Sequence, residues 1–148
     1  MGAYNCDLGR TADNTNGVAV YQPASALKRI KVGDIIFGVT GTPADAAYSL
    51  QAQRSTAAPS GGTAVTPQPL DAADGAASGL SMDGTVTNGT TTANAFLLNI
   101  ALNQRSTFRW VAREGKELVI PSTNANGVHF LTPIGTALTI QWGIHIEE

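Results

Sequence analysis

The strongest structural signal in the sequence is the stretch at residues 138–146, which reads LTIQWGIHI. Large apolar side chains alternate there with small or polar ones, and the apolar positions are Leu138, Ile140, Trp142, Ile144 and Ile146. Because successive side chains of a strand point to opposite faces of a sheet, this alternation predicts a β-strand with one buried face and one polar face.

Similar short patterns recur along the chain. They predict strands at 18–21, 27–39, 47–54, 95–103, 107–112, 117–120 and 128–131, separated by Gly, Pro, Asn and Thr. Residues 95–103 fit a strand buried on both faces or a short helix, and their Asn residues and the nearby threonines favour the strand. The alternation within 27–39 slips at Gly33–Asp34, which predicts a bulge or bend.

About eight strands and no long amphipathic helix indicate an all-β fold, an antiparallel β-sandwich or jelly roll. We expect one domain over residues 1–148, in which residues 1–17 form an extended N-terminal arm. Asp71 is a candidate N-cap for a single helical turn at 71–74.

Composition narrows the classes of function. The chain has 148 residues, 43% of them apolar, which is enough to build a core without disulfides or metals. Its formal charge of −2 argues against binding nucleic acid or an anionic membrane through bulk charge. Apolar runs are too short for a membrane helix. The sequence shows no basic region followed by an apolar one, so we expect no secretory signal.

Residues 55–94 are poor in large apolar side chains, with only Val65, Leu70, Leu80, Met82 and Val86. Ordering a backbone costs roughly 1–2 kcal/mol per residue, so such a segment cannot offset that cost by collapsing on itself. We expect a long, irregular, Gly-, Ala- and Thr-rich loop that neighbouring chains hold in place, including by pairing with a partner's strand edge.

Candidate metal sites are weak. His145 and Glu147 fall on one strand face, but zinc would need two more ligands, so a solvated polar pair is favoured. Asp71, Asp74 and Asp83 fit turn and cap residues better than calcium ligands. We expect no metal and no cofactor.

The sequence shows no catalytic motif. No Gly-x-Ser-x-Gly motif or cysteine signature is visible, and Cys6, the single cysteine, fits a packing role. Glu114 and Glu117 flank a predicted hairpin turn, where charges are usually solvated. We therefore expect no enzymatic activity and no small-molecule substrate.

Three arginines are evenly spaced: Arg105, Arg109 and Arg113 fall on one side of a predicted strand. A solvated face is the favoured reading, and salt links to another subunit or anion binding are the alternatives. Trp110 and Trp142 lie on predicted inward faces, which favours the core over a sugar-stacking platform.

Several blocks resemble a known family. They are residues 27–38 (LKRIKVGDIIFG), 64–71 (AVTPQPLD), and 103–110 (NQRSTFRW) through 117–121 (ELVIP). Together they are similar to the jelly-roll decoration, or cement, proteins on the outside of tailed-bacteriophage capsids. The resemblance implies a virion protein made in the host cytoplasm, which binds major capsid protein subunits as an oligomer, usually a trimer, and carries no catalytic residues.

We therefore predict a non-enzymatic decoration protein on the outer capsid surface, which stabilises contacts between major capsid protein subunits. The expected interface residues are Tyr4, Tyr21, Leu70, Asp71, Arg105, Arg109 and Arg113. The alternative is a receptor- or glycan-binding module of a phage tail or fibre, with Tyr4, Tyr21 and Tyr48 on exposed loops.

Overall fold

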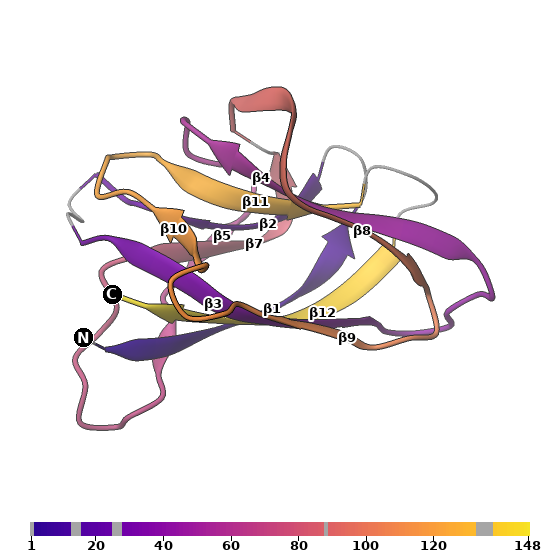
Figure 1. Cartoon of the computed structure of the whole chain (residues 1–148), viewed down its shortest axis with the longest axis horizontal. Coiled ribbons are helices and arrows are strands. Elements are labelled where there is room, and N and C mark those ends of the chain that lie inside the picture. Colours follow the sequence, from indigo (N-terminus) through magenta and orange to yellow (C-terminus); the bar gives the residue numbers. More distant parts are fainter. Residues whose placement is uncertain (1, 13–15, 25–27, 88, 133–137) are drawn as a thin grey trace.

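Two antiparallel sheets pack face to face in the computed structural model (Figure 1). The structure describes residues 2–12, 16–24, 28–87, 89–132 and 138–148, and within them the chain forms twelve strands and no helix. The prediction of an antiparallel β-sandwich is therefore confirmed. Both termini lie side by side at one end, where the Gly2 amide donates to the Glu148 carbonyl at 3.0 Å.

The first sheet is the lower layer in Figure 1, and its strands run in the order β10, β3, β12, β1, β6, with β9 also paired to β3. Its strands are β1 (Ala3–Ala12), β3 (Ile30–Val39), β6 (Gln68–Pro69), β9 (Phe108–Val111), β10 (Leu118–Ile120) and β12 (Leu138–Glu147).

The second sheet is the upper layer, with strands in the order β5, β7, β2, β11, β4, β8. Its strands are β2 (Asn16–Tyr21), β4 (Ala47–Ser55), β5 (Thr63–Val65), β7 (Leu80–Thr87), β8 (Thr91–Asn103) and β11 (Gly127–Leu131).

The pairing of the chain's two halves gives the jelly-roll topology. Strand β1 pairs with β12, β2 with β11, β3 with β9 and β10, and β4 with β8, so the first strands meet the last ones. Alternate pairs belong to alternate sheets, as expected when a long paired ribbon wraps into a jelly roll. Strands β5, β6 and β7 are additions to this framework.

The core lies between the sheets and is built from the alternating positions of the strands. Trp142 of β12 is fully buried, and its ring packs against Phe37 at 5.1 Å and Phe130 at 5.8 Å between centroids. These three rings join strands of both sheets. The predicted inward face of residues 138–146 is thereby confirmed.

The predicted irregularity at Gly33–Asp34 is a β-bulge. His145 pairs with Asp34 and Ile146 with Val32, so Gly33 is the extra residue on β3. The bulge lets Val32 and Ile35 both point into the core although they are three residues apart.

The expected N-terminal arm is instead a strand of the first sheet, which lies between β12 and the short strand β6. All ten residues of β1 pair with β12, and Tyr4, Cys6 and Leu8 are buried. These three side chains alternate with Asn5, Asp7 and Gly9, so one face of the strand joins the core. The prediction of an arm over 1–17 is wrong for β1.

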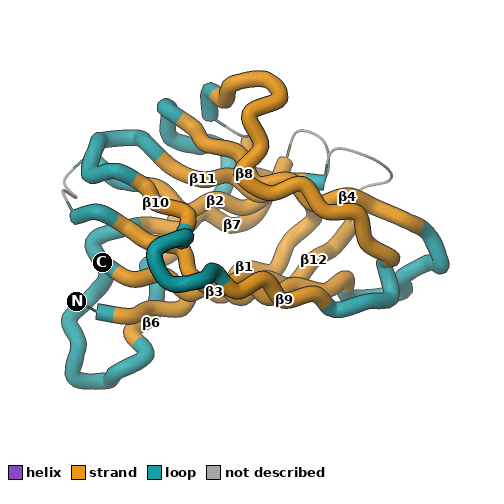
Figure 2. The backbone as a smooth tube through the Cα atoms, in the orientation of Figure 1, coloured by secondary structure: helices purple, strands orange, loops and turns teal. Residues whose placement is uncertain are grey.

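The expected irregular loop at 55–94 also contains strands. Strand β7 pairs with β2, β5 pairs with β7, and β6 pairs with β1, so the segment extends both sheets of its own chain. Figure 2 shows the loop between β6 and β7 projecting beyond β6, at the end where the termini lie. Asp71 starts a turn there, not a helix, with its carboxylate accepting from the Ala73 amide at 2.9 Å.

A buried carboxylate fixes the end of this loop. The Glu148 side chain is fully buried and accepts from the Ser78 amide at 2.5 Å and the Gly79 amide at 3.0 Å. Backbone pairing and this contact hold the segment in place, and Val65 and Ala77 also pack against the core. Contacts with neighbouring chains are therefore not needed to explain why residues 55–94 are ordered, although the segment has few large apolar side chains.

Residues 95–103 lie within β8, so a strand was the correct choice. The strand is only half-buried or exposed along its length, and the expectation that it is buried on both faces is wrong. The reason is that β8 lies at the edge of the second sheet, where one side has no neighbouring strand among the described residues.

Candidate functional site on the outer face of the first sheet

The first sheet turns one face away from the core, and we call this surface the outer face. It consists of the outward side chains of β1, β12, β3 and β9. The strand registers align Asn5, His145, Asp34 and Val111 in one row across the sheet. The next row contains Asp7, Gly143, Ile36 and Arg109.

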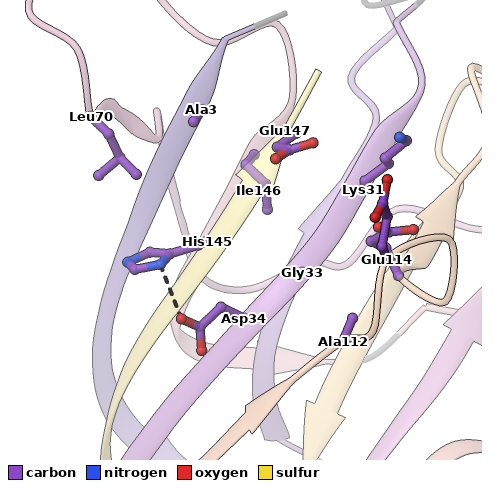
Figure 3. A pocket seen from close by; sticks show the side chains of 11 residues that line it. Ala3, Lys31, Gly33, Asp34, Leu70, Ala112, Glu114, His145, Ile146 and Glu147 are labelled. Carbon is purple, nitrogen blue, oxygen red and sulfur yellow. Dashed lines mark ion pairs between the residues drawn. The ribbon is translucent and has the colours of Figure 1, made fainter.

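Asp34 is the electrostatic centre of this surface. Its carboxylate accepts from Arg109 Nε at 3.0 Å and from Arg109 Nη2 at 2.5 Å, a two-pronged contact. His145 Nδ1 lies 3.4 Å from Asp34 Oδ2, the oxygen that also accepts from Arg109 Nη2 (Figure 3). The hydrogen bonds from Arg109 hold the pKa of Asp34 below its ordinary value, so the carboxylate stays charged.

A hollow of about 400 Å³ opens beside Asp34. Figure 3 shows Leu70 on one side of it, beyond β1, and Lys31 and Glu114 on the other. The bulge at Gly33 leaves room here, because a glycine adds no side chain to the surface. A second hollow of about 430 Å³ lies further along β12 and is lined by Ile36 and Gly143 among others.

Charged groups surround the first hollow. Glu117 accepts from the Gly115 amide at 3.0 Å, and backbone amide hydrogen bonds hold the pKa of Glu117 below its ordinary value. Glu114 and Glu147 are exposed, and Lys31 lies beside them. An open surface with several charges suits salt links and hydrogen bonds to another macromolecule.

Apolar side chains are exposed on the same surface. Ile36 is 41% exposed, Val111 58% and Leu70 57%, and these are the large apolar residues most exposed in the described part of the chain. Ile36 and Val111 flank the pair of Asp34 and Arg109 on neighbouring strands. Apolar contacts around a charge pair that can be desolvated are typical of protein interfaces.

The candidate metal ligands and the cysteine do not form a metal site among the described residues. His145 and Glu147 lie on the outer face as predicted, but among the described residues no group of three His, Cys, Asp or Glu side chains could hold a metal ion. Cys6 is buried, and burial raises the pKa of its thiol to about 12. In the described ranges no helix is long and apolar enough to cross a membrane.

The tyrosines are not surface residues. Tyr4, Tyr21 and Tyr48 are 4%, 7% and 3% exposed. Tyr4 and Tyr48 belong to the core between the sheets, whereas Tyr21 alternates with the core residues Val18 and Val20 and is buried on the other face of β2. Tyr4 and Tyr21 therefore have little surface to offer a partner. The exposed-loop placement that the glycan-binding alternative requires is wrong for all three.

The three arginines do not share a strand face. Arg109 lies on β9 and pairs with Asp34, whereas Arg105 and Arg113 are exposed in the turns that follow β8 and β9. The even spacing misled because a strand of four residues cannot span positions 105 to 113. Leu70 and Asp71 are exposed, Leu70 at the rim of the first hollow.

Three residues of the outer face were missed as site candidates: Asp34, Ile36 and Val111. His145 was considered only as a metal ligand, not as a neighbour of Asp34. Their grouping depends on which strands are neighbours and in which register, which short-range patterns do not carry. The slip at Gly33–Asp34 was a usable signal, since bulges frequently occur next to functional sites.

No family model matches the chain, and no curated protein or solved structure matches it either.

Proposed function

We propose that this chain is a non-enzymatic capsid decoration protein, which binds the outside of a tailed-phage head and stabilises contacts between major capsid protein subunits. The observation that carries the proposal is the outer face, where Ile36 and Val111 are exposed beside a charged pair on a broad sheet surface. The jelly-roll topology supports it, since this topology recurs in virion proteins. The resemblance of the sequence blocks points the same way.

The proposed mechanism is multivalent. Each contact between the outer face and the shell is modest, but an oligomer presents several faces at a high effective concentration. A bound oligomer then links neighbouring capsid subunits and resists their separation. Its location would be the outer capsid surface after synthesis in the host cytoplasm.

Co-sedimentation tests this proposal directly. The probe is a shell assembled from the major capsid protein that is encoded together with this chain. We expect the unmodified chain to sediment with the shells and to raise their resistance to heat. Full occupancy without any gain in heat resistance would contradict a cementing role, and absence of binding would contradict the location.

Two variants assign the binding surface. Ile36→Glu and Val111→Glu place a charge on the outer face without touching the core, because both side chains are exposed. We expect each to weaken shell binding by about ten-fold or more, as for central apolar contacts of an interface. Ser122→Glu adds the same charge at an exposed position in the loop between β10 and β11 and should bind normally.

A further inference from the structure

The open edge of the second sheet has the properties of a strand-pairing site. Strand β8 ends the strand order of that sheet, and no described strand lies on its other side. Its regular part, residues 98–103, reads LNIALN and has no charge, no proline and no glycine. Proteins normally protect such edges with charges, prolines, bulges or short length, so an unprotected one is a template for another strand.

The earlier part of β8 is protected in this way. Register shifts interrupt its pairing with β4 near Gln53, and Asn94 has a left-handed backbone with φ of 60°. Such bulges bend a strand away from a straight edge. The last shift falls between Phe96 and Leu98, so the regular edge begins at Leu98.

The register identifies which backbone groups face outward. The Gln104 amide donates to the Ala46 carbonyl at 3.0 Å, and Leu102 is opposite Tyr48. Since hydrogen-bonded and non-bonded pairs alternate in an antiparallel ladder, Asn99 and Ala101 form non-bonded pairs with β4. Their N–H and C=O groups consequently point to the open edge.

Apolar side chains lie along the same edge. Leu98, Ile100 and Leu102 face the inside of the sandwich, opposite Ala52, Leu50 and Tyr48, yet each is only half-buried. On the same side of the sandwich the first sheet has β9 at its edge (Figure 1). Phe108 and Trp110 of β9 are also half-buried. A strand added to β8 would extend the second sheet over this apolar seam.

We propose that the added strand is β8 of a second copy of this chain, paired antiparallel and centred on Ile100. This register places Asn99 opposite Ala101 of the second copy, so each copy donates two outward N–H groups and accepts at two carbonyls. It also places Ile100 beside Ile100 of the second copy, and Leu98 beside Leu102 of the second copy. The apolar row thus continues across the twofold axis.

A second copy fits this edge better than other occupants. The remaining outer strands of the described chain, β5, β6, β9 and β10, span two to four residues, so none matches the length of β8. An uncharged strand pairs with itself without like-charge repulsion. The contact is isologous and gives a twofold dimer, whereas the family resemblance implies a trimer.

The mass of the unmodified chain in solution is the first test. Sedimentation equilibrium should give twice the chain mass at about 100 μM, a concentration at which even a micromolar dimer is populated. A monomer at this concentration would overturn the inference. So would a trimer in which the cross-linking test below finds no contact between two β8 strands. Either result leaves the outcome of shell binding, and hence the proposed function, separately measurable.

Cross-linking tests the register. In the proposed dimer the two copies of residue 100 form a non-bonded pair with Cα atoms about 4.5 Å apart, within reach of a disulfide. Ile100→Cys should therefore yield a covalent dimer with oxidised glutathione. Cys6 does not compete, because it is buried and its pKa is raised to about 12.

Leu102→Cys is the matched control. It lies on the same face of the same strand, but its two copies would be about 13 Å apart along the paired strands, too far for a disulfide. We expect about ten-fold more covalent dimer from Ile100→Cys than from Leu102→Cys. Equal yields from the two variants would overturn the register.

Ala101→Pro removes an outward N–H without removing a bond to β4, and edge strands tolerate proline at such positions. It should convert the dimer to a monomer while the thermal unfolding transition remains cooperative. A dimer that persists in this variant would overturn the inference. If the variant fails to fold, the mass and cross-linking results decide alone.

Discussion

Acid should destabilise this protein through one buried imidazole. His129 lies on β11 with no exposed surface, and the Gly89 amide donates to its Nδ1 at 3.2 Å. Burial disfavours the charged form and lowers the pKa of His129 to about 4, whereas a free histidine has a pKa near 6.5. The folded chain therefore keeps this ring neutral across a range in which the unfolded chain protonates it.

The sign and size of the effect follow from linkage. Between pH 6.5 and about 4 the unfolded state binds a proton that the folded state does not, so the free energy of unfolding falls as the pH falls. Above pH 6.5 the contribution is fully present, and below pH 4 it changes no further. Each pH unit in the window corresponds to about 1.4 kcal/mol, so the total loss is about 3 kcal/mol.

Urea unfolding followed by tryptophan fluorescence measures this loss, since Trp142 is fully buried in the core. His129→Asn keeps an acceptor for the Gly89 amide but cannot titrate, so its stability should fall by about 3 kcal/mol less than that of the unmodified chain between about pH 7 and pH 4. Carboxylates titrate in both proteins and cancel in the difference. Parallel pH profiles for the unmodified chain and His129→Asn would refute the reasoning.

Three further changes test other features. Asp34→Asn should lower the urea midpoint at neutral pH but not well below the ordinary pKa of aspartate, because the ion pair with Arg109 stabilises the fold only while the carboxylate is charged. Ala125→Gly should raise the free energy of unfolding by about 1 kcal/mol, since Ala125 has a φ of 66° that glycine adopts without strain. Glu148→Gln should speed deuterium exchange at the Gly79 amide about ten-fold, because a charged acceptor is replaced by a neutral one. No change in the measured quantity would contradict the respective assignment.

Strands with strict alternation could be predicted from the sequence because their side chains record which face is buried. In β4, Tyr48, Leu50 and Ala52 are buried as the alternation indicated. The bulge at Gly33 was also visible, since an extra residue must interrupt the period of two. Tyr4, Cys6 and Leu8 carried the same signal, but Asn5, Asp7 and Gly9 between them favour turns and obscured it.

The candidate site was less predictable. Exposure of Leu70 and Arg109 could be expected from the sequence, but not that Arg109 meets Asp34, since these residues are far apart in the chain. Asp34 and His145 are neighbours only because β3 pairs with β12 in one particular register. Single-strand patterns indicate faces but not registers, and therefore cannot assemble a site from several strands.

The middle segment explains why a partner is expected at one edge of the sandwich and not the other. Strands β5 and β7 extend the second sheet beyond β2, and β6 extends the first beyond β1, all on the same side. The outermost of these, β5 and β6, have three and two residues, and such short strands offer little for another chain to pair with. On the opposite side, β8 ends the second sheet as a long uncharged strand.

The low content of large apolar side chains predicted that residues 55–94 are held in place by other molecules, but the strands of this segment pair within the chain. The edge of β8, which has no neighbouring strand among the described residues, lies instead in a stretch rich in apolar residues. The proposed dimer would therefore use a strand edge and not a segment poor in apolar side chains.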